Sequence, residues 1–224
     1  MDRGAVAIRR AKIAAVDVVN PVIEEYLRRS LPTGDEVTLE MERLADRRRF
    51  PIVGPLVGRL LYVLARAIGA REIFECGSGF GYSAYWFARA LPPGGRVVLT
   101  EGSSENCASA RGFLGRAGLM DRAVIEKGDA LDILPRYSGP FDIIFCDIDK
   151  RDYPRVHAVM MPRLRSGGLF VCDNMLWSGR VASDAHQDED TRGVRELTRL
   201  LYADPGLHTT ILPLRDGVSV SLRD

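Results

Sequence analysis

Acidic residues that end short apolar runs are the first candidates for chemistry in this chain. Glu75, Glu101, Asp129, Asp147 and Asp173 each lie at or just beyond the end of such a run. The runs have the length and composition of buried strands, and the carboxyl ends of parallel strands meet at one edge of a sheet. Any one of these acids can instead cap a helix or stabilise a turn. Five of them at one predicted edge favour a binding site over five unrelated turns.

A glycine-rich turn follows the first of these acids. Gly77, Gly79 and Gly81 give the spacing G-x-G-x-G, whereas the turn that binds a dinucleotide pyrophosphate has G-x-G-x-x-G. Glu75, just before the turn, would repel a phosphate but would attract a cation. The pattern therefore suits a positively charged ligand such as S-adenosylmethionine, although an ordinary tight turn can have the same glycine content.

Glu101 ends the second apolar run, about 20 residues past the glycine turn, where an acid can accept both hydroxyls of a ribose. This position fits an adenosyl cofactor and NAD equally well. The alternative role for Glu101 is to cap a helix that starts near Glu105.

Asp147, Asp173 and Asn174 form a second possible constellation at the ends of the fourth and fifth runs. Two carboxylates and an amide oxygen are hard ligands, which suit Mg2+, Ca2+ or Mn2+ better than zinc or copper. A cation would also relieve the repulsion between the two acids. The alternative is two turn residues beside an asparagine cap.

Lys150 lies three residues after Asp147, where its amine can reach a substrate at such an ion. Burial and a nearby cation would lower its pKa and allow it to act as a general base, with Asp147 beside it. A lysine in the charged stretch KRDY is just as compatible with a solvated surface turn.

The elements that must position these residues alternate between strand and helix. Strands are expected at 71–76, 96–101, 123–127, 141–147, 168–173, 208–213 and 218–222. Helices are expected at 82–90, 105–117, 130–134, 151–164 and 191–203, preceded by 35–48, 56–68 and one or two helices within 5–29, where Pro21 starts or bends the second. The alternation predicts a doubly wound, Rossmann-like α/β fold, and the turn Asp216-Gly217 predicts a C-terminal antiparallel hairpin.

Composition indicates an ordinary globular protein. The 224 residues are 46% hydrophobic with a net charge of +1, which gives no reason to expect nucleic acid or a membrane as partner. We expect a single domain over 1–224, with 1–50 as a helical extension and 51–224 as the catalytic core. The four cysteines form no C-x-x-C pair and indicate reduced core residues of a cytoplasmic protein. The three histidines show no ligand or triad spacing.

The order of several motifs resembles that of the cation-dependent O-methyltransferases, the family of caffeoyl-CoA and catechol O-methyltransferases. The shared stretches are EIFECGSGFGYSA, VVLTEG, KGDALDILP, FDIIFCDIDKRDY, GGLFVCDNMLWSGRV and LPLRDGVSV, over roughly 51–222. The DxDKxxY and DNxLWxGxV blocks are far more specific to this family than the glycine turn is. Residues 33–50 match less well, and because this region helps to shape the acceptor pocket in relatives, the acceptor is left open.

The resemblance implies a role for each matching position. The residues implied to line the S-adenosylmethionine site are Val53, Glu75, Gly77, Ser78, Ser83, Glu101, Ala130 and Asp149. Asp147, Asp173 and Asn174 would hold Mg2+, or Ca2+ or Mn2+ in its place, and Lys150 would be the base. The implied reaction is methylation of one hydroxyl of a vicinal diol, such as a catechol or a caffeoyl compound. Relatives of the caffeoyl-CoA type are commonly homodimers, so the resemblance also implies a homodimer. A nicotinamide-dependent oxidoreductase and a non-catalytic S-adenosylmethionine-binding module are the alternatives.

Overall fold

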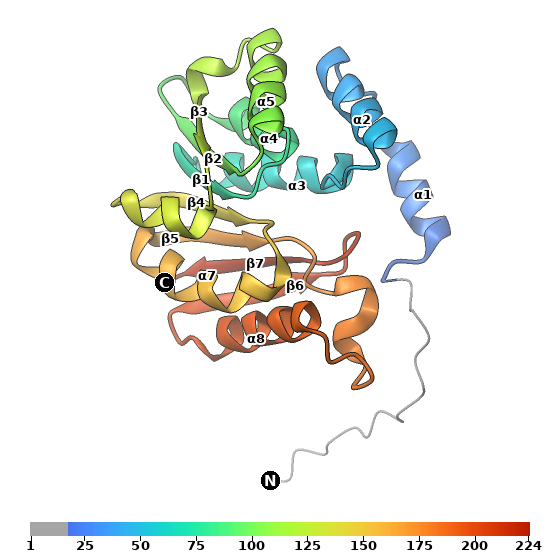
Figure 1. Ribbon diagram of the computed structural model, residues 1–224, viewed down its shortest axis with the longest axis vertical. Helices are drawn as coiled ribbons and strands as arrows, with labels where there is room; N and C mark the ends of the chain where they lie inside the picture. Colours follow the sequence, from blue (N-terminus) through green and yellow to red (C-terminus); the bar gives the residue numbers. More distant parts are fainter. Residues whose placement is uncertain (1–17) are drawn as a thin grey trace.

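A seven-stranded sheet forms the centre of the computed structural model, which describes residues 18–224 (Figure 1). The strands follow the order β3-β2-β1-β4-β5-β7-β6, and β7 is antiparallel to both of its neighbours. Their bounds are β1 Glu72–Cys76, β2 Arg96–Glu101, β3 Ala123–Lys127, β4 Phe141–Cys146, β5 Leu164–Cys172, β6 Leu207–Leu212 and β7 Val218–Arg223. The prediction of a mostly parallel α/β sheet with a C-terminal hairpin is confirmed.

Helices cover both faces of the sheet because successive strand residues point to opposite sides. In β1, Ile73 packs with the helices of one face, whereas Phe74 packs with those of the other. The first face carries α2 (Glu36–Arg48), α3 (Gly54–Ala67), α4 (Tyr82–Ala90) and α5 (Ser104–Arg116). The second carries α6 (Ala130–Ile133), α7 (Tyr153–Met160) and α8 (Glu189–Ala203). Within residues 18–224, no helix has the length and hydropathy needed to span a bilayer.

The helix α1 (Pro21–Ser30) lies at the edge of the helical layer, away from the sheet (Figure 1). Its N-cap is Asn20, whose side chain accepts a hydrogen bond from the amide of Val22 at 2.9 Å. Pro21 occupies the first turn, where its missing N–H costs nothing, so the prediction that Pro21 starts a helix is confirmed. The expected helix nearer Ala5 lies outside the described residues. α1 buries none of its side chains, whereas α2 buries Met41 at the core.

The stretch expected to be a helix over 151–164 is shorter than predicted. It consists of the 3-10 turn η3 (Lys150–Asp152), α7 and the 3-10 turn η4 (Met161–Arg163), and Leu164 already begins β5. The prediction placed the start of this strand at Gly168, whereas Gly167 and Gly168 lie inside it. They form an irregularity within β5 instead, since a Cβ on Gly168 would stand 2.9–3.0 Å from two backbone carbonyl oxygens. Three further short 3-10 segments connect the elements within residues 18–224: η1 Met120–Arg122, η2 Leu134–Arg136 and η5 Trp177–Ala182.

Candidate functional site

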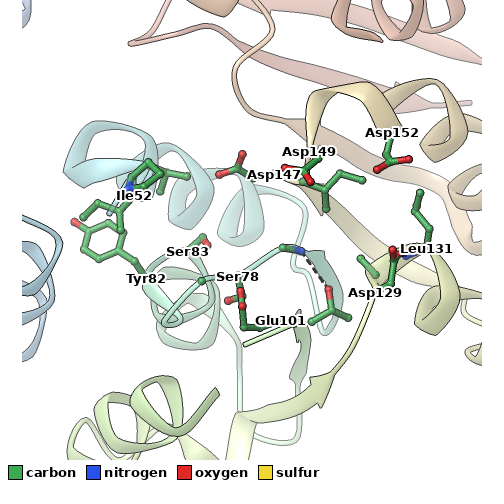
Figure 2. Close-up of a pocket in the computed structure, with 18 of the residues that line it drawn as sticks. Ile52, Ser78, Tyr82, Ser83, Glu101, Asp129, Leu131, Asp147, Asp149 and Asp152 are labelled. Carbon is green, nitrogen blue, oxygen red and sulfur yellow. Dashed lines mark hydrogen bonds between the residues drawn. The ribbon is translucent and has the colours of Figure 1, made fainter. Parts of the chain in front are cut away.

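A cavity of about 620 Å³ opens at the carboxyl ends of β1, β2 and β4, where a doubly wound sheet usually binds its ligand (Figure 2). Figure 2 shows Asp147, Asp149 and Asp152 along one side of it, with Ser78, Ser83 and Glu101 below. Nine of the residues assigned from the sequence to the cofactor, the ion or the base line this cavity: Val53, Gly77, Ser78, Ser83, Glu101, Ala130, Asp147, Asp149 and Lys150.

The glycine turn brings its backbone against the end of β4. Gly77 has a φ of 81°, and a Cβ on this residue would lie 2.3 Å from the carbonyl oxygen of Asp147. The close approach therefore excludes any side chain at this position. Thr100 fixes the turn from β2, because its hydroxyl accepts from the Gly77 amide at 3.2 Å and donates to the Glu75 carbonyl at 2.8 Å.

Glu75 lies behind the cavity wall and is fully buried. Its carboxylate oxygens accept hydrogen bonds from the hydroxyls of Ser83 and Ser78, and both serines line the cavity. Burial raises the pKa of Glu75 to about 8, although the two serine hydroxyls pull it down in part. Glu75 therefore faces the cavity through two serines rather than directly, unlike the other implied cofactor residues.

Glu101 ends β2 and lines the cavity. Its Oε1 accepts from the amide of Ser103 at 2.7 Å and from the side-chain amide of Asn106 at 3.3 Å. The N-cap of α5 is Ser103, whose hydroxyl accepts from the Asn106 amide at 3.3 Å. Glu101 is thus not the helix cap, and its carboxylate is oriented by the first turn of α5 while lining the cavity.

Lys150 forms an ion pair with Asp147 in which Nζ lies 2.8 Å from Oδ1, and it also donates to the carbonyl of Ile148 at 3.0 Å. The ammonium lies 5.2 Å from the Tyr153 ring centroid and 5.6 Å from that of Trp177. Burial alone would lower the pKa of Lys150, but the charge of Asp147 and its hydrogen bond raise it overall. In this arrangement Lys150 is a paired ammonium with a raised pKa, and the expected fall, which depends on a nearby cation, stays a prediction.

Asp173 is 4% exposed, and its Oδ1 has no hydrogen-bond partner among residues 18–224. Burial and the neighbouring charge of Asp147 raise the pKa of Asp173 to about 7, while Arg215 and Lys150 oppose the rise. An unpartnered buried carboxylate oxygen beside a second carboxylate is costly by itself and is well suited to a divalent cation. These two acids therefore fit the predicted ion.

Asn174 follows Asp173 with a φ of 56°, in the left-handed region. In the described part of the chain, no three histidine, cysteine, aspartate or glutamate side chains gather into a metal site. An ion at this point would consequently need the amide oxygen of Asn174, and water or acceptor oxygens, to complete its coordination.

Comparison with known proteins gives this arrangement a context. The sequence pattern of the O-methyltransferase family matches residues 38–224, which is most of the chain. The chain belongs to the O-methyltransferase family. It is an enzyme of the methyltransferase class, as the resemblance in its motifs predicted, and this favours methyl transfer over the nicotinamide-dependent alternative.

Named relatives of this O-methyltransferase include members of both expected groups. It is 36% identical over 179 residues to a catechol O-methyltransferase of Niastella koreensis, with 76% of this chain and 81% of that protein covered. It is 33% identical over 178 residues to a caffeoyl-CoA O-methyltransferase of Petroselinum crispum, with 74% of each covered. An O-methyltransferase of Bacillus cereus, solved in complex with SAH, matches with a TM-score of 0.83 and 31% identity over 91% of this chain and 97% of that one.

Several cavity residues of this O-methyltransferase were missed from the sequence. Ile52 and Tyr82 form the far side of the cavity, and Leu131 lies beside Asp129 (Figure 2). Tyr82 directly follows the glycine turn, so its position next to the ligand site could have been anticipated. Nothing in the spacing of Ile52 indicates a role, because it reaches the cavity only through the packing of α3.

Proposed function

We propose that this protein transfers a methyl group from S-adenosylmethionine to one hydroxyl of a vicinal diol, such as a catechol or a caffeoyl compound, with the help of a divalent cation. The observation that carries the cation is the buried, unpartnered Oδ1 of Asp173 beside Asp147. The names of the relatives, catechol and caffeoyl-CoA O-methyltransferase, support the choice of acceptor. The complex of the Bacillus cereus enzyme with SAH supports the choice of cofactor.

The cavity supplies the groups that an adenosyl cofactor needs. We assign the ribose hydroxyls to Glu101, whose carboxylate is already oriented by Ser103 and Asn106. The remaining contacts are assigned to Val53, Gly77, Ser78, Ser83, Ala130 and Asp149, with Glu75 acting through the two serines. S-adenosylmethionine supplies a methyl group on a positively charged sulfur, and an acidic cavity favours such a cation.

The proposed ion, Mg2+ or in its place Ca2+ or Mn2+, is held by Asp147, Asp173 and Asn174. When bound, it lowers the pKa of a hydroxyl that it contacts. Because Asp147 belongs to the cavity wall, a diol at an ion held by these acids would lie at the end of the cofactor cavity. Most of the acceleration comes from this alignment of two reactants.

Lys150 is the proposed acid–base group. Its Nζ contacts Oδ1 of Asp147, and Asp147 is one of the residues assigned to the ion that the diol would contact. Lys150 therefore lies next to the position assigned to the diol. A cation shared by Asp147 weakens the hold of this carboxylate on the ammonium, which lowers the pKa of Lys150 toward the range of a base. Lys150 then accepts or relays the proton that the diol hydroxyl loses.

The test is a methyl-transfer assay on a panel of catechols and caffeoyl conjugates, with EDTA and then with Mg2+ or Mn2+ added back. We expect EDTA to abolish the transfer and either ion to restore it. Asp173→Ala should behave like the EDTA-treated enzyme while still folding and binding S-adenosylhomocysteine, because removing one of two crowded acids relieves repulsion. Full activity in EDTA would contradict the ion, and cofactor binding without transfer to any diol would favour a non-catalytic module.

A homodimer and a cytoplasmic location stay predictions. The apolar side chains of α1 support the first, because Val22 and Tyr26 are 75% and 66% exposed and α1 buries no residue of its own. The four cysteines are all free and buried, which is compatible with a reducing compartment. The treatment of residues 1–224 as a single domain is likewise untested.

A further inference from the structure

The turn between β6 and β7, residues 213–217, packs against two segments that border the proposed site. The first is the loop that follows β5. The amides of Met175 and Leu176 donate to the carbonyls of Gly217 and Asp216, both at 2.9 Å. A Cβ on Gly217, whose φ is 88°, would lie 2.8 Å from the Leu176 amide nitrogen. The turn is therefore fixed to the loop that carries Asp173 and Asn174.

The second segment is the rim segment, residues 50–54, which leads into α3. Four of its residues line the cofactor cavity: Phe50, Pro51, Ile52 and Val53. Arg215 reaches across from the turn, and its Nη1 donates to the carbonyl of Ile52 at 2.6 Å. Its guanidinium lies against Gly54, where a Cβ would come within 3.1 Å of Nη1 and 3.4 Å of Cζ. A side chain at Gly54, whose φ is 72°, would adopt a strained backbone conformation and would push the guanidinium aside by a few tenths of an ångström.

Arg215 is the only side chain among residues 18–224 that hydrogen-bonds to the rim segment. Its backbone adopts a φ of 51°, a left-handed conformation that is unfavourable for a residue with a Cβ. Arg215 thus connects the turn, which is bonded to the loop after β5, with the rim segment.

We propose that Arg215 is a positioning residue, which holds the rim segment in place along the cofactor cavity. The inference rests on the proposed use of this cavity for S-adenosylmethionine. With Arg215 present, the wall formed by Ile52 and Val53 is already ordered when the cofactor enters. The free energy of cofactor binding is therefore not reduced by the cost of ordering this wall. Arg215 itself is not among the residues that line the cavity, so it acts through the rim segment.

The experiment compares wild type with Arg215→Ala and Arg215→Lys. Calorimetry should show S-adenosylhomocysteine binding about tenfold weaker in Arg215→Ala, because one charged hydrogen bond to the rim is lost. The KM for S-adenosylmethionine should rise by a similar factor while kcat stays within about twofold, since Asp147 and Lys150 are untouched. Lysine keeps the charge and one donor and should restore part of the affinity. The matched control is Arg199→Ala, which loses only a surface ion pair with Glu196 and should bind as wild type does.

A folded Arg215→Ala with wild-type affinity for S-adenosylhomocysteine would overturn the inference. An equal loss of affinity in Arg199→Ala, or a fall in the kcat of Arg215→Ala with KM unchanged, would also overturn it. If Arg215→Ala does not fold, Arg215→Gln replaces it, with the same expected loss and the same contradicting result. A wild-type protein that binds no S-adenosylhomocysteine would instead overturn the proposed function, and the inference with it.

Discussion

At the scale of single residues, Lys150 is the side chain whose environment has the most direct chemical consequence. Its amine is paired with Asp147, donates to the Ile148 carbonyl and lies near two aromatic rings. Only 11% of the side chain is exposed. A lysine that merely solvates a surface turn would not be enclosed in this way, so the surface interpretation that the sequence left open does not hold.

Lys150→Met separates a chemical role from a positioning role. Methionine keeps the apolar stem beside Tyr153 and Trp177 but removes the amine. We expect kcat to fall by about 10²–10⁴ in the presence of Mg2+, with S-adenosylhomocysteine affinity within about twofold of wild type. Steady-state kinetics and calorimetry measure the two quantities. Arg151→Met, the exposed neighbour with a 3.8 Å surface pair to Asp190, is the control and should keep its kcat. A rise in KM alone would reassign Lys150 to substrate positioning.

At the scale of elements, the helix α8 determines where the Lys150 loop lies. Asp188 caps the helix by accepting from the Thr191 amide at 3.0 Å, which places Gly193 one turn further along. A Cβ on Gly193 would stand 2.0 Å from the carbonyl oxygen of Lys150 and 3.2 Å from the Cα of Arg151. The backbone of η3 therefore packs directly against α8 at Gly193. This contact fixes the position of the Lys150 backbone relative to the helix.

Gly193→Ala tests the contact between α8 and η3. The substitution has two effects of opposite sign on stability: alanine favours the helix, but its Cβ meets the backbone of η3. In an unobstructed helix, glycine to alanine stabilises by about 0.5–1 kcal/mol. Here we expect a loss of stability and a fall in kcat of about tenfold or more, because the neighbouring atoms are backbone and must move. Gly112→Ala in α5 is the matched control, since nothing lies within 4 Å of its added Cβ, and it should gain the propensity term. Urea denaturation and steady-state kinetics measure both variants. A stabilised, fully active Gly193→Ala would contradict this prediction, because it would show that the backbone of η3 moves to accommodate the added Cβ.

At the scale of the whole molecule, the parts that the sequence could predict are those that depend on local pattern. Alternating strands and helices determine a parallel sheet, and parallel strands bring Glu101 and Asp147 to the same edge regardless of detail. The contact of Arg215 with Ile52 joins residues 163 positions apart, and no local spacing encodes it. The burial of Glu75 behind its serines was missed for the same reason, because it depends on how α4 closes over β1.

The buried Glu75 gives the whole molecule a pH-dependent stability. Its pKa is about 8 in the folded protein and near its ordinary value of 4.5 when unfolded. Between these two values the folded state retains a proton that the unfolded state has lost. The free energy of unfolding therefore decreases as pH rises through this window, by at most about 1.4 kcal/mol per pH unit from this one group. Asp173 contributes with the same sign over a lower range, since its pKa is raised to about 7.

Glu75→Gln isolates the contribution of this one carboxyl. Glutamine has nearly the same shape and stays uncharged at every pH; its oxygen can accept from one of the two serine hydroxyls, Ser78 or Ser83, while its NH2 group donates to the other. Between pH 6 and pH 8 the unfolding free energy of wild type should fall by about 2 kcal/mol or more beyond any fall in the variant. Urea denaturation without cofactor and in EDTA measures both proteins across this range. The residual slope in the variant reports Asp173 and other groups, so the difference between the two curves is the quantity that matters. Parallel curves would mean that Glu75 is already ionised at pH 6, with its charge carried by the two serine hydroxyls.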